Sequence, residues 1–94
     1  MADRVAVQAR IEGRVQGVWF RGWTVDQATA RDLAGWVRNR RDGTVEALFA
    51  GPEPDVRDML AVCHKGPPAA RVTSVTESPA PHPDAPGFVQ LPTV

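Results

Sequence analysis

Cysteine is almost absent from this sequence, in which Cys63 is the single thiol. One thiol excludes an internal disulfide and a thiolate metal cage, so the fold must rely on packing, as is usual in a reducing compartment. A charged-then-apolar leader is also missing, and no apolar run approaches the roughly 18 residues that a membrane span needs. We therefore expect a cytoplasmic protein that has no membrane partner.

An excess of one charge is missing as well. The 11 basic and 11 acidic side chains cancel, and the isoelectric point lies near 6.7. The chain therefore lacks the positive field on which non-specific nucleic-acid and membrane-surface binders rely, and a small soluble partner is favoured. Its 94 residues suffice for one core but not for a separate regulatory module. We expect one domain, residues 1–94, with one site.

Alternating side chains mark the first strand of the chain. Between residues 5 and 15, apolar or small side chains alternate with polar ones, which is the period of a strand with one face in water. A glycine-containing turn follows, and residues 22–33 have the length of a helix, although their apolar stripe is irregular. Residues 36–40 and 44–50 are predicted to pair as an antiparallel hairpin, because Gly43 can supply the positive φ of a tight turn.

The second half of the sequence predicts a more regular helix and at least one further strand. Apolar side chains recur at helical spacing after Pro54, at Val56, Met59, Leu60 and Cys63. Residues 71–76 are predicted as a strand, the proline-rich segment 79–86 as a stiff connector, and residues 88–91 as a short edge strand. The order β-α-β-β-α-β predicts an α+β, ferredoxin-like sandwich. In it, an antiparallel four-stranded sheet, with room for a fifth edge strand, carries both helices on one face.

The segment from Gly13 to Arg21 joins the first predicted strand to the first predicted helix. A loop at such a junction aims backbone N–H groups and a helix N-terminus at one point. Gly17 lets a phosphate approach because it has no Cβ, and Arg21 offers a planar fork of donors that matches phosphate oxygens. The segment therefore predicts an anion site, although a tight turn with a solvated arginine has the same composition.

Asn39 ends a predicted strand beside a charged turn. Its amide can accept a hydrogen bond from one group and donate another to a phosphate. An asparagine at a strand end more often bonds its own backbone as a turn former, so this residue alone decides nothing. The neighbouring Arg38, Arg40 and Arg41 are interpreted either as a cluster that steers anions toward the site or as a solvated charged turn.

Two motifs in these segments resemble those of a known family. Residues 11–21, IEGRVQGVWFR, resemble the first acylphosphatase signature at every specified position. Residues 35–39, GWVRN, followed by DGTV at 42–45 and by Gly51, are similar to the second motif of the family in residue type and spacing. Residues 66–72, GPPAARV, resemble the helix-to-strand junction of the family, so the resemblance covers nearly the whole chain.

The resemblance implies a monomeric hydrolase that splits the carboxyl-phosphate anhydride bond of acyl phosphates without a metal or an organic cofactor. It assigns phosphate binding to Arg21 and placement of the attacking water to Asn39. It also implies a phosphate cradle made by the backbone amides of Val15, Gln16, Gly17, Val18, Trp19 and Phe20. Inorganic phosphate is expected as product and competitive inhibitor. Arg31 and Asp32 depart from the apolar residue and the glycine that are usual in the family, which predicts different packing at the end of the first helix.

The residue types fit this reaction. Hydrolysis of a phosphate anhydride needs a positioned water and stabilisation of charge on the phosphate oxygens. A carboxylate leaving group, whose acid has a pKa of roughly 4, departs without a general acid. A metal pair, a catalytic acid or a covalent nucleophile, as used for alkyl phosphates, is not indicated, and His64 and His82 are expected at the surface. Because Asn39 cannot act as a base, a phosphate oxygen of the substrate is the candidate proton acceptor.

Other side chains allow two interpretations each. Trp19, Trp23 and Trp36 are either a platform for an aromatic substrate or packing residues of the core and its rim. Cys63 continues the apolar stripe of its helix, which favours an inert, semi-buried thiol over a nucleophile.

Two rival functions remain at this point. The same architecture hosts non-catalytic binding modules, but the aromatic-basic signature of an RNA-binding sheet is absent and nucleic acid is not an expected partner. The chain is also similar to the acylphosphatase-like domain of carbamoyl-transfer proteins, although no zinc-binding cysteine pattern follows it.

Overall fold

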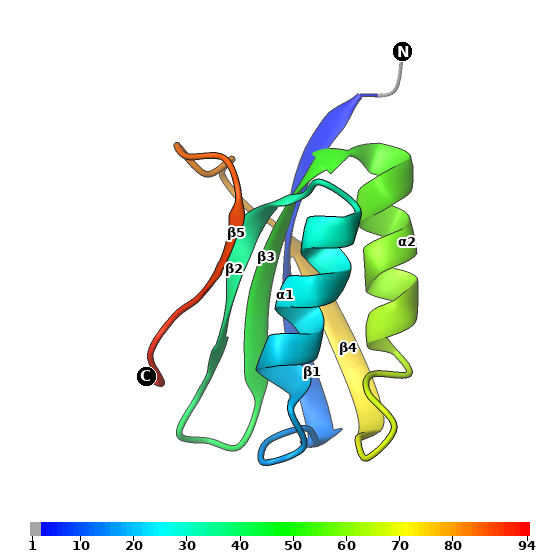
Figure 1. Ribbon diagram of the computed structural model, residues 1–94, viewed down its shortest axis with the longest axis vertical. Helices are drawn as coiled ribbons and strands as arrows, with labels where there is room; N and C mark the ends of the chain where they lie inside the picture. The colour runs from blue at the N-terminus through cyan, green and yellow to red at the C-terminus, as the bar shows by residue number, and fades with distance from the viewer. Residues whose placement is uncertain (1–2) are drawn as a thin grey trace.

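The computed structural model describes residues 3–94, which form one sheet with two helices on one face (Figure 1). The elements are β1 (Arg4–Arg14), α1 (Phe20–Ala30), β2 (Ala34–Asn39), β3 (Val45–Pro52), α2 (Glu53–Cys63), β4 (Arg71–Pro79) and β5 (Phe88–Gln90). The strand order is β4-β1-β3-β2-β5. The ferredoxin-like prediction is confirmed, and the fifth edge strand is present. Met1 and Ala2 of the predicted domain 1–94 lie outside the described residues.

The sheet is antiparallel except at one edge. β3 pairs antiparallel with both β1 and β2, and β4 pairs antiparallel with β1, whereas β5 runs parallel to β2. A parallel neighbour requires a long connection, and residues 80–87 supply it between β4 and β5. The ends of β2 and β5 therefore point the same way, which places the last residues of the chain beside Asn39.

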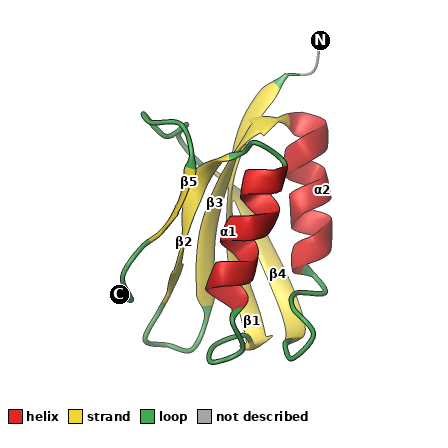
Figure 2. Cartoon of the chain, viewed as in Figure 1, coloured by secondary structure: helices red, strands yellow, loops and turns green. Residues whose placement is uncertain are grey.

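The main core lies between the sheet and the helices (Figure 2). Val45, Ala47 and Phe49 alternate along β3 and are fully buried on this face. The four apolar residues predicted for α2 are buried against them. Phe88 stacks on Phe49 with ring centroids 5.5 Å apart, which attaches β5 to the core. Both helices have 11 residues, and within residues 3–94 no helix has the length and apolarity needed to cross a membrane.

Helix α1 begins at Phe20 rather than Gly22 and ends at Ala30 rather than near residue 33. Its N-cap residue, Trp19, has a left-handed backbone (φ 66°) and makes no side-chain cap hydrogen bond. The usual sequence signal of a helix start, a capping Ser, Thr, Asp or Asn, is therefore missing at this position.

The end of α1 is a Schellman motif that contains an aspartate where glycine is usual. Asp32 has φ 55°, and the N–H groups of Asp32 and Leu33 donate to carbonyls of the last helical turn at 3.0 Å each. Arg31 donates from Nε to Asp58 of α2 at 2.8 Å. The two departures from the family pattern thus lie together, and an ion pair connects the helices at this point.

The face of the sheet opposite the helices carries a charged cluster around Glu46. This carboxylate is almost completely buried and accepts hydrogen bonds from Gln8 (2.6 Å), Arg38 (2.7 Å), Arg40 (3.1 Å) and Arg10 (3.5 Å). Burial by itself raises the pKa of Glu46, but the hydrogen bonds and charges of Arg38 and Arg40 outweigh it and hold the pKa below its usual value.

The proline-rich connector crosses this second face. β4 extends to Pro79, beyond the predicted end at residue 76, because its pairing with β1 continues as far as Val7. The N–H of Ala80 then donates to the carbonyl of Ala6 at 3.2 Å. Ala80 also packs on a small apolar cluster that is separate from the main core.

Candidate active site

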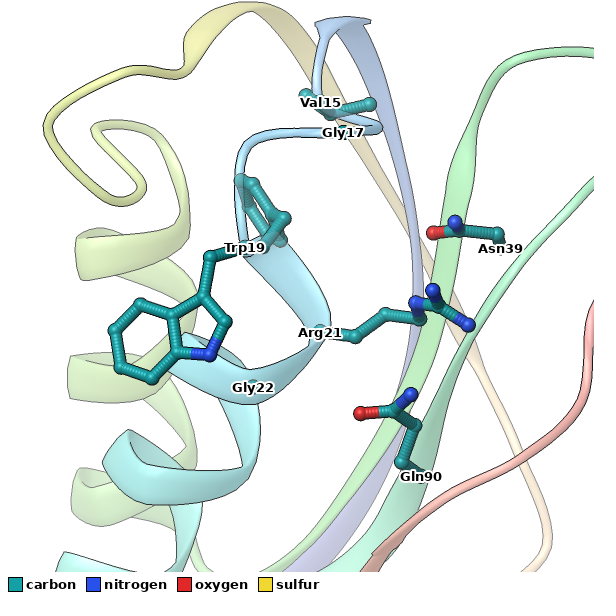
Figure 3. A pocket seen from close by; sticks show the side chains of 8 residues that line it. Val15, Gly17, Trp19, Arg21, Gly22, Asn39 and Gln90 are labelled. Atoms are coloured by element: carbon teal, nitrogen blue, oxygen red, sulfur yellow. The ribbon is translucent and has the colours of Figure 1, made fainter.

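A cavity of about 170 Å³ lies where the start of α1 faces the end of β2 (Figure 3). Its lining residues are Val15, Gly17, Trp19, Phe20, Arg21, Gly22, Asn39 and Gln90. Since a water molecule takes about 30 Å³ in the liquid, a tetrahedral anion and a water fit together. The lining includes no carboxylate, histidine or thiol. In the part of the chain that the structure describes, no three His, Cys, Asp or Glu side chains gather in a way that suits a metal ion.

The loop between β1 and α1 forms one wall of this cavity. Val15 and Val18 anchor it in the core with exposures of 1% and 9%. Between them Gly17 has φ 72°, and a Cβ at this position would meet nothing within 4 Å, so the loop borders open space. At Gly17 the loop therefore meets this open space with its backbone rather than with a side chain.

The backbone N–H groups of this loop lack hydrogen-bond partners in the described part of the chain. The first hydrogen bond of the helix runs from the N–H of Trp23 to the carbonyl of Trp19 at 3.0 Å. No acceptor within residues 3–94 receives the N–H groups of residues 16–22. Unpaired N–H groups at a helix N-terminus, where the helix dipole is positive, favour an anion.

Arg21 lies in the first turn of α1, and its side chain reaches across the cavity toward β2 (Figure 3). Its guanidinium makes no ion pair with a carboxylate of residues 3–94, whereas the helix residues Arg31 and Arg57 pair with Asp58 and Glu77. The donors of Arg21 therefore remain free for an anion from solution.

Asn39 lies at the end of β2, and its amide is next to the Arg21 guanidinium (Figure 3). The turn that follows is formed by Asp42, whose carboxylate accepts hydrogen bonds from the N–H and hydroxyl of Thr44 at 3.0 and 2.6 Å. These hydrogen bonds lower the pKa of Asp42. The turn-forming role that is common for asparagine thus belongs to Asp42, and the Asn39 amide is available to the cavity.

Gln90 is a lining residue that the sequence analysis missed. It comes from β5, and its amide lies on the other side of the Arg21 guanidinium from Asn39 (Figure 3). The tail beyond β5 continues along β2, where the N–H of Val94 donates to the carbonyl of Asn39 at 3.1 Å. No motif signals Gln90, because only the parallel pairing of β5 with β2 brings it to the cavity.

The arginines beside Asn39 do not act as one cluster. Strand alternation places Arg38 and Arg40 on the opposite face of the sheet, where both bind Glu46. The Arg38 guanidinium also lies 4.6 Å from the centroid of a Trp36 ring. Arg41 is exposed, and none of the three lines the cavity.

The three tryptophans have different environments. Trp23 packs against Phe20 with ring centroids 5.3 Å apart, and Trp36 lies against the second face of the sheet. Trp19 is 63% exposed, and its indole covers Gly22, pointing away from the Arg21 guanidinium (Figure 3). Packing is therefore confirmed for two of the three residues, and Trp19 instead lies in solvent at the cavity rim.

The remaining candidates lie away from the cavity. Cys63 is fully buried, and burial raises the pKa of its thiol to about 12, so the thiol is not an ionised nucleophile at neutral pH. His64 and His82 are both exposed, as predicted.

Comparison with known proteins shows the family of this chain. The family model described as acylphosphatase matches residues 7–89 of the chain. The chain belongs to the acylphosphatase family. The predicted resemblance to this family is thereby confirmed, and both motifs lie inside the matched range.

Similar proteins have the same size and shape. The acylphosphatase of Rhodospirillum rubrum is 60% identical over 85 residues, which are 90% of this chain and 93% of that protein. The acylphosphatase structure from Coxiella burnetii has a TM-score of 0.90 at 28% identity, covering 95% of this chain and 94% of that one. The acylphosphatase crystal structure from Bacillus subtilis has a TM-score of 0.87 at 34% identity, covering 93% and 98%. As an acylphosphatase, this protein hydrolyses acyl phosphates to a carboxylate and inorganic phosphate.

Proposed function

We propose that acyl phosphates bind with the phosphoryl group in the cavity between the β1–α1 loop and Asn39. The Arg21 guanidinium and the backbone N–H groups of Val15, Gln16, Gly17, Val18, Trp19 and Phe20 hold the phosphate oxygens. The observation that carries this assignment is a guanidinium without an ion-pair partner among residues 3–94, beside a loop whose N–H groups 16–22 lack acceptors in the same range. Both are positive, preorganised donors that stabilise charge on a phosphoryl group during transfer.

Asn39 holds the attacking water in this proposal. Its amide lies beside Arg21, so a water bound there is close to the phosphorus of a substrate held by the guanidinium. The water oxygen forms a bond to phosphorus while the bond from phosphorus to the acyl oxygen breaks. The carboxylate leaves as an anion, because its conjugate acid has a pKa of roughly 4, and no general acid is required.

The proton of the water passes to a phosphate oxygen of the substrate. This step follows from the absence of carboxylate, histidine and thiol among the residues that line the cavity. An Asp or Glu variant that abolished turnover while phosphate still bound would contradict it. The cavity holds the phosphoryl end of the substrate, and we assign no residue to the acyl end. We therefore expect several acyl groups, carbamoyl included, to be accepted.

The properties of the whole protein are part of the same proposal. Residues 1–94 act as one monomeric domain in the cytoplasm, without a metal or organic cofactor. Inorganic phosphate, the product, inhibits competitively because it occupies the phosphoryl position. Its inhibition constant is therefore a direct measure of phosphate binding that does not depend on catalysis.

The experiment is hydrolysis of benzoyl phosphate by the wild type and by Asn39→Ala, each with and without a chelator. We expect a fall in kcat of about 100-fold for Asn39→Ala, in line with the loss of one transition-state contact, with little change in phosphate inhibition. Gln27→Ala, on α1 and outside the cavity, is the control that stays near wild type. Full turnover by Asn39→Ala would remove its assigned role, and loss of activity with the chelator would overturn the metal-independent reaction.

A further inference from the structure

Gln16 lies between two residues of the cavity wall, but its own side chain points elsewhere. Val15 and Gly17 line the cavity, whereas the side-chain amide of Gln16 leaves the loop and reaches the β2–β3 turn. Its Nε2 donates to the carbonyl of Arg40 at 2.7 Å and to the carbonyl of Thr44 at 2.8 Å. Arg40 directly follows Asn39, so the side chain connects the phosphate loop to the strand end that carries Asn39.

The two acceptors fix the orientation of the Gln16 amide. Both partners are carbonyl oxygens, so only the NH₂ group can face them, and both of its hydrogens are used. The same carbonyls also accept hydrogen bonds within the turn, from Gly43 to Arg40 at 3.1 Å and from Arg40 to Thr44 at 2.9 Å. Gln16 therefore binds the turn at the two residues that close it.

The hydrogen bond from the N–H of Trp23 to the carbonyl of Trp19 joins the end of the loop to α1, not to the turn. Val15 and Val18 hold the loop by apolar packing, which tolerates small shifts of the backbone more readily than a pair of hydrogen bonds. Within residues 3–94, the side-chain hydrogen bonds between loop 15–19 and turn 40–44 are the two made by Gln16. The Gln16 amide is thus the direct side-chain link between loop and turn.

We propose that Gln16 is a positioning residue that sets the distance between the phosphate held by the loop and the water held by Asn39. The inference rests on the proposed role of Asn39. Without the Gln16 link, the loop still binds the phosphate and Asn39 still binds the water. The position of the water oxygen relative to the phosphorus atom is then disturbed. A displacement of about 1 Å between reacting atoms is enough for about a 100-fold loss of rate.

The main test is Gln16→Met, which keeps the length of the side chain and removes both donors. We expect kcat for benzoyl phosphate to fall by about 10- to 100-fold, while KM and the inhibition constant of inorganic phosphate change by less than about threefold. Gln27→Met is the matched control, because Gln27 lies on α1 outside the cavity and its variant stays near wild type. An inhibition constant that rises as much as kcat/KM falls would show a damaged cradle and overturn the inference.

A double-mutant cycle separates positioning from general support of the loop. If Gln16 acts through Asn39, adding Gln16→Met to Asn39→Ala lowers kcat by less than about threefold further. If the fold-losses in kcat of the two single variants multiply in the double variant, the inference is overturned while the role of Asn39 stays intact. If Asn39→Ala alone kept full activity, the proposed function would fail instead, so the two outcomes can be told apart.

Gln16→Glu is a second test, which does not depend on the stability of the Gln16→Met variant. A carboxylate would face the two carbonyl oxygens and repel them, whereas a protonated carboxyl offers one donor. We expect the kcat of this variant, relative to wild type, to rise as the pH falls toward the carboxyl pKa of about 4. A constant ratio between pH 7 and pH 4.5 would count against the inference. Circular dichroism of each variant establishes that the fold is retained.

Discussion

The Nε of Arg38 lies 2.7 Å from the carboxylate of Glu46, on the face of the sheet that the helices leave uncovered. The carboxylate is 4% exposed, and Arg40 and Arg10 complete its surroundings. Because these guanidinium groups bind the ionised form, they connect the stability of the protein to pH.

The pKa of Glu46 in the folded chain is below its usual 4.5, so this group binds protons more readily in the unfolded chain. Its contribution to stability is fully present above pH 4.5 and is lost as the pH falls through the folded pKa. Glu46→Gln is expected to lower the free energy of unfolding by about 1–2 kcal/mol at pH 7 and by less at pH 3. Urea denaturation at both pH values measures this difference.

Glu77→Gln is the matched control for Glu46. Glu77 pairs with Arg57 at 2.7 Å, but both side chains are more than a third exposed. An exposed pair of this kind contributes about 0–1 kcal/mol, so the control is expected to unfold almost as the wild type does. Equal effects of the two variants would contradict the role assigned to the buried cluster.

Arg21→Lys is expected to lower kcat/KM for benzoyl phosphate by at least about 100-fold, because a single ammonium cannot replace the two parallel donors of a guanidinium. Phosphate inhibition should weaken in the same variant, since Arg21 is proposed to bind the phosphate in substrate and product alike. Arg14→Lys is the control, as Arg14 ends β1, is exposed and does not line the cavity. Near-normal turnover by Arg21→Lys would refute the assignment.

Gln90→Ala tests the lining residue that comes from β5. Removing one neutral amide from the cavity is expected to lower kcat/KM by about 3- to 10-fold, equivalent to one hydrogen bond of about 1 kcal/mol. Val89→Ala, a change at the preceding exposed residue that does not line the cavity, should leave the rate unchanged. Steady-state kinetics with benzoyl phosphate give both values, and identical rates for the two variants would exclude Gln90 from the reaction.

Asp32→Gly is expected to stabilise the protein by up to about 1 kcal/mol, because glycine takes a φ of 55° without the steric conflict of a Cβ. Asp32→Ala keeps the Cβ and loses the polar side chain that tolerates this conformation, so it should destabilise. Urea midpoints of the two variants should therefore move in opposite directions. Movement in the same direction would show that backbone strain at Asp32 is not the cause.

The sequence predicted the strands, the second helix and the residues of the two motifs, because periodic burial and glycine-rich turns are local signals. It did not locate the start of α1, since Trp19 takes a left-handed backbone without a capping side chain. It also underestimated β4, where pairing with β1 continues up to Pro79. In both cases tertiary contacts decide what local propensity leaves open.

The presence of Arg21 and Asn39 in the cavity, to which we assign phosphate and water binding, was predictable because both stand in motifs, whereas the residues around them were not. Gln90 reaches the cavity through a strand pairing that no spacing encodes, and Gln16 makes side-chain bonds to a turn that is distant in sequence. The alternation of β2 does predict where Arg38 and Arg40 lie, because a strict period of two places both side chains on the face of the sheet opposite to Asn39. Reading that period would have removed them from the candidate site.

Strand β5 and the tail that follows it cover the edge of β2 with backbone hydrogen bonds from Leu91 and Val94. An uncovered sheet edge is a template on which a second copy can add its own strand, and self-association of this kind leads to aggregates. The last seven residues therefore guard the solubility of the fold as well as supplying Gln90 to the cavity. A chain shortened before Phe88 would lose the cover of β2 and Gln90 together. We expect it to hydrolyse acyl phosphates more slowly and to precipitate more readily.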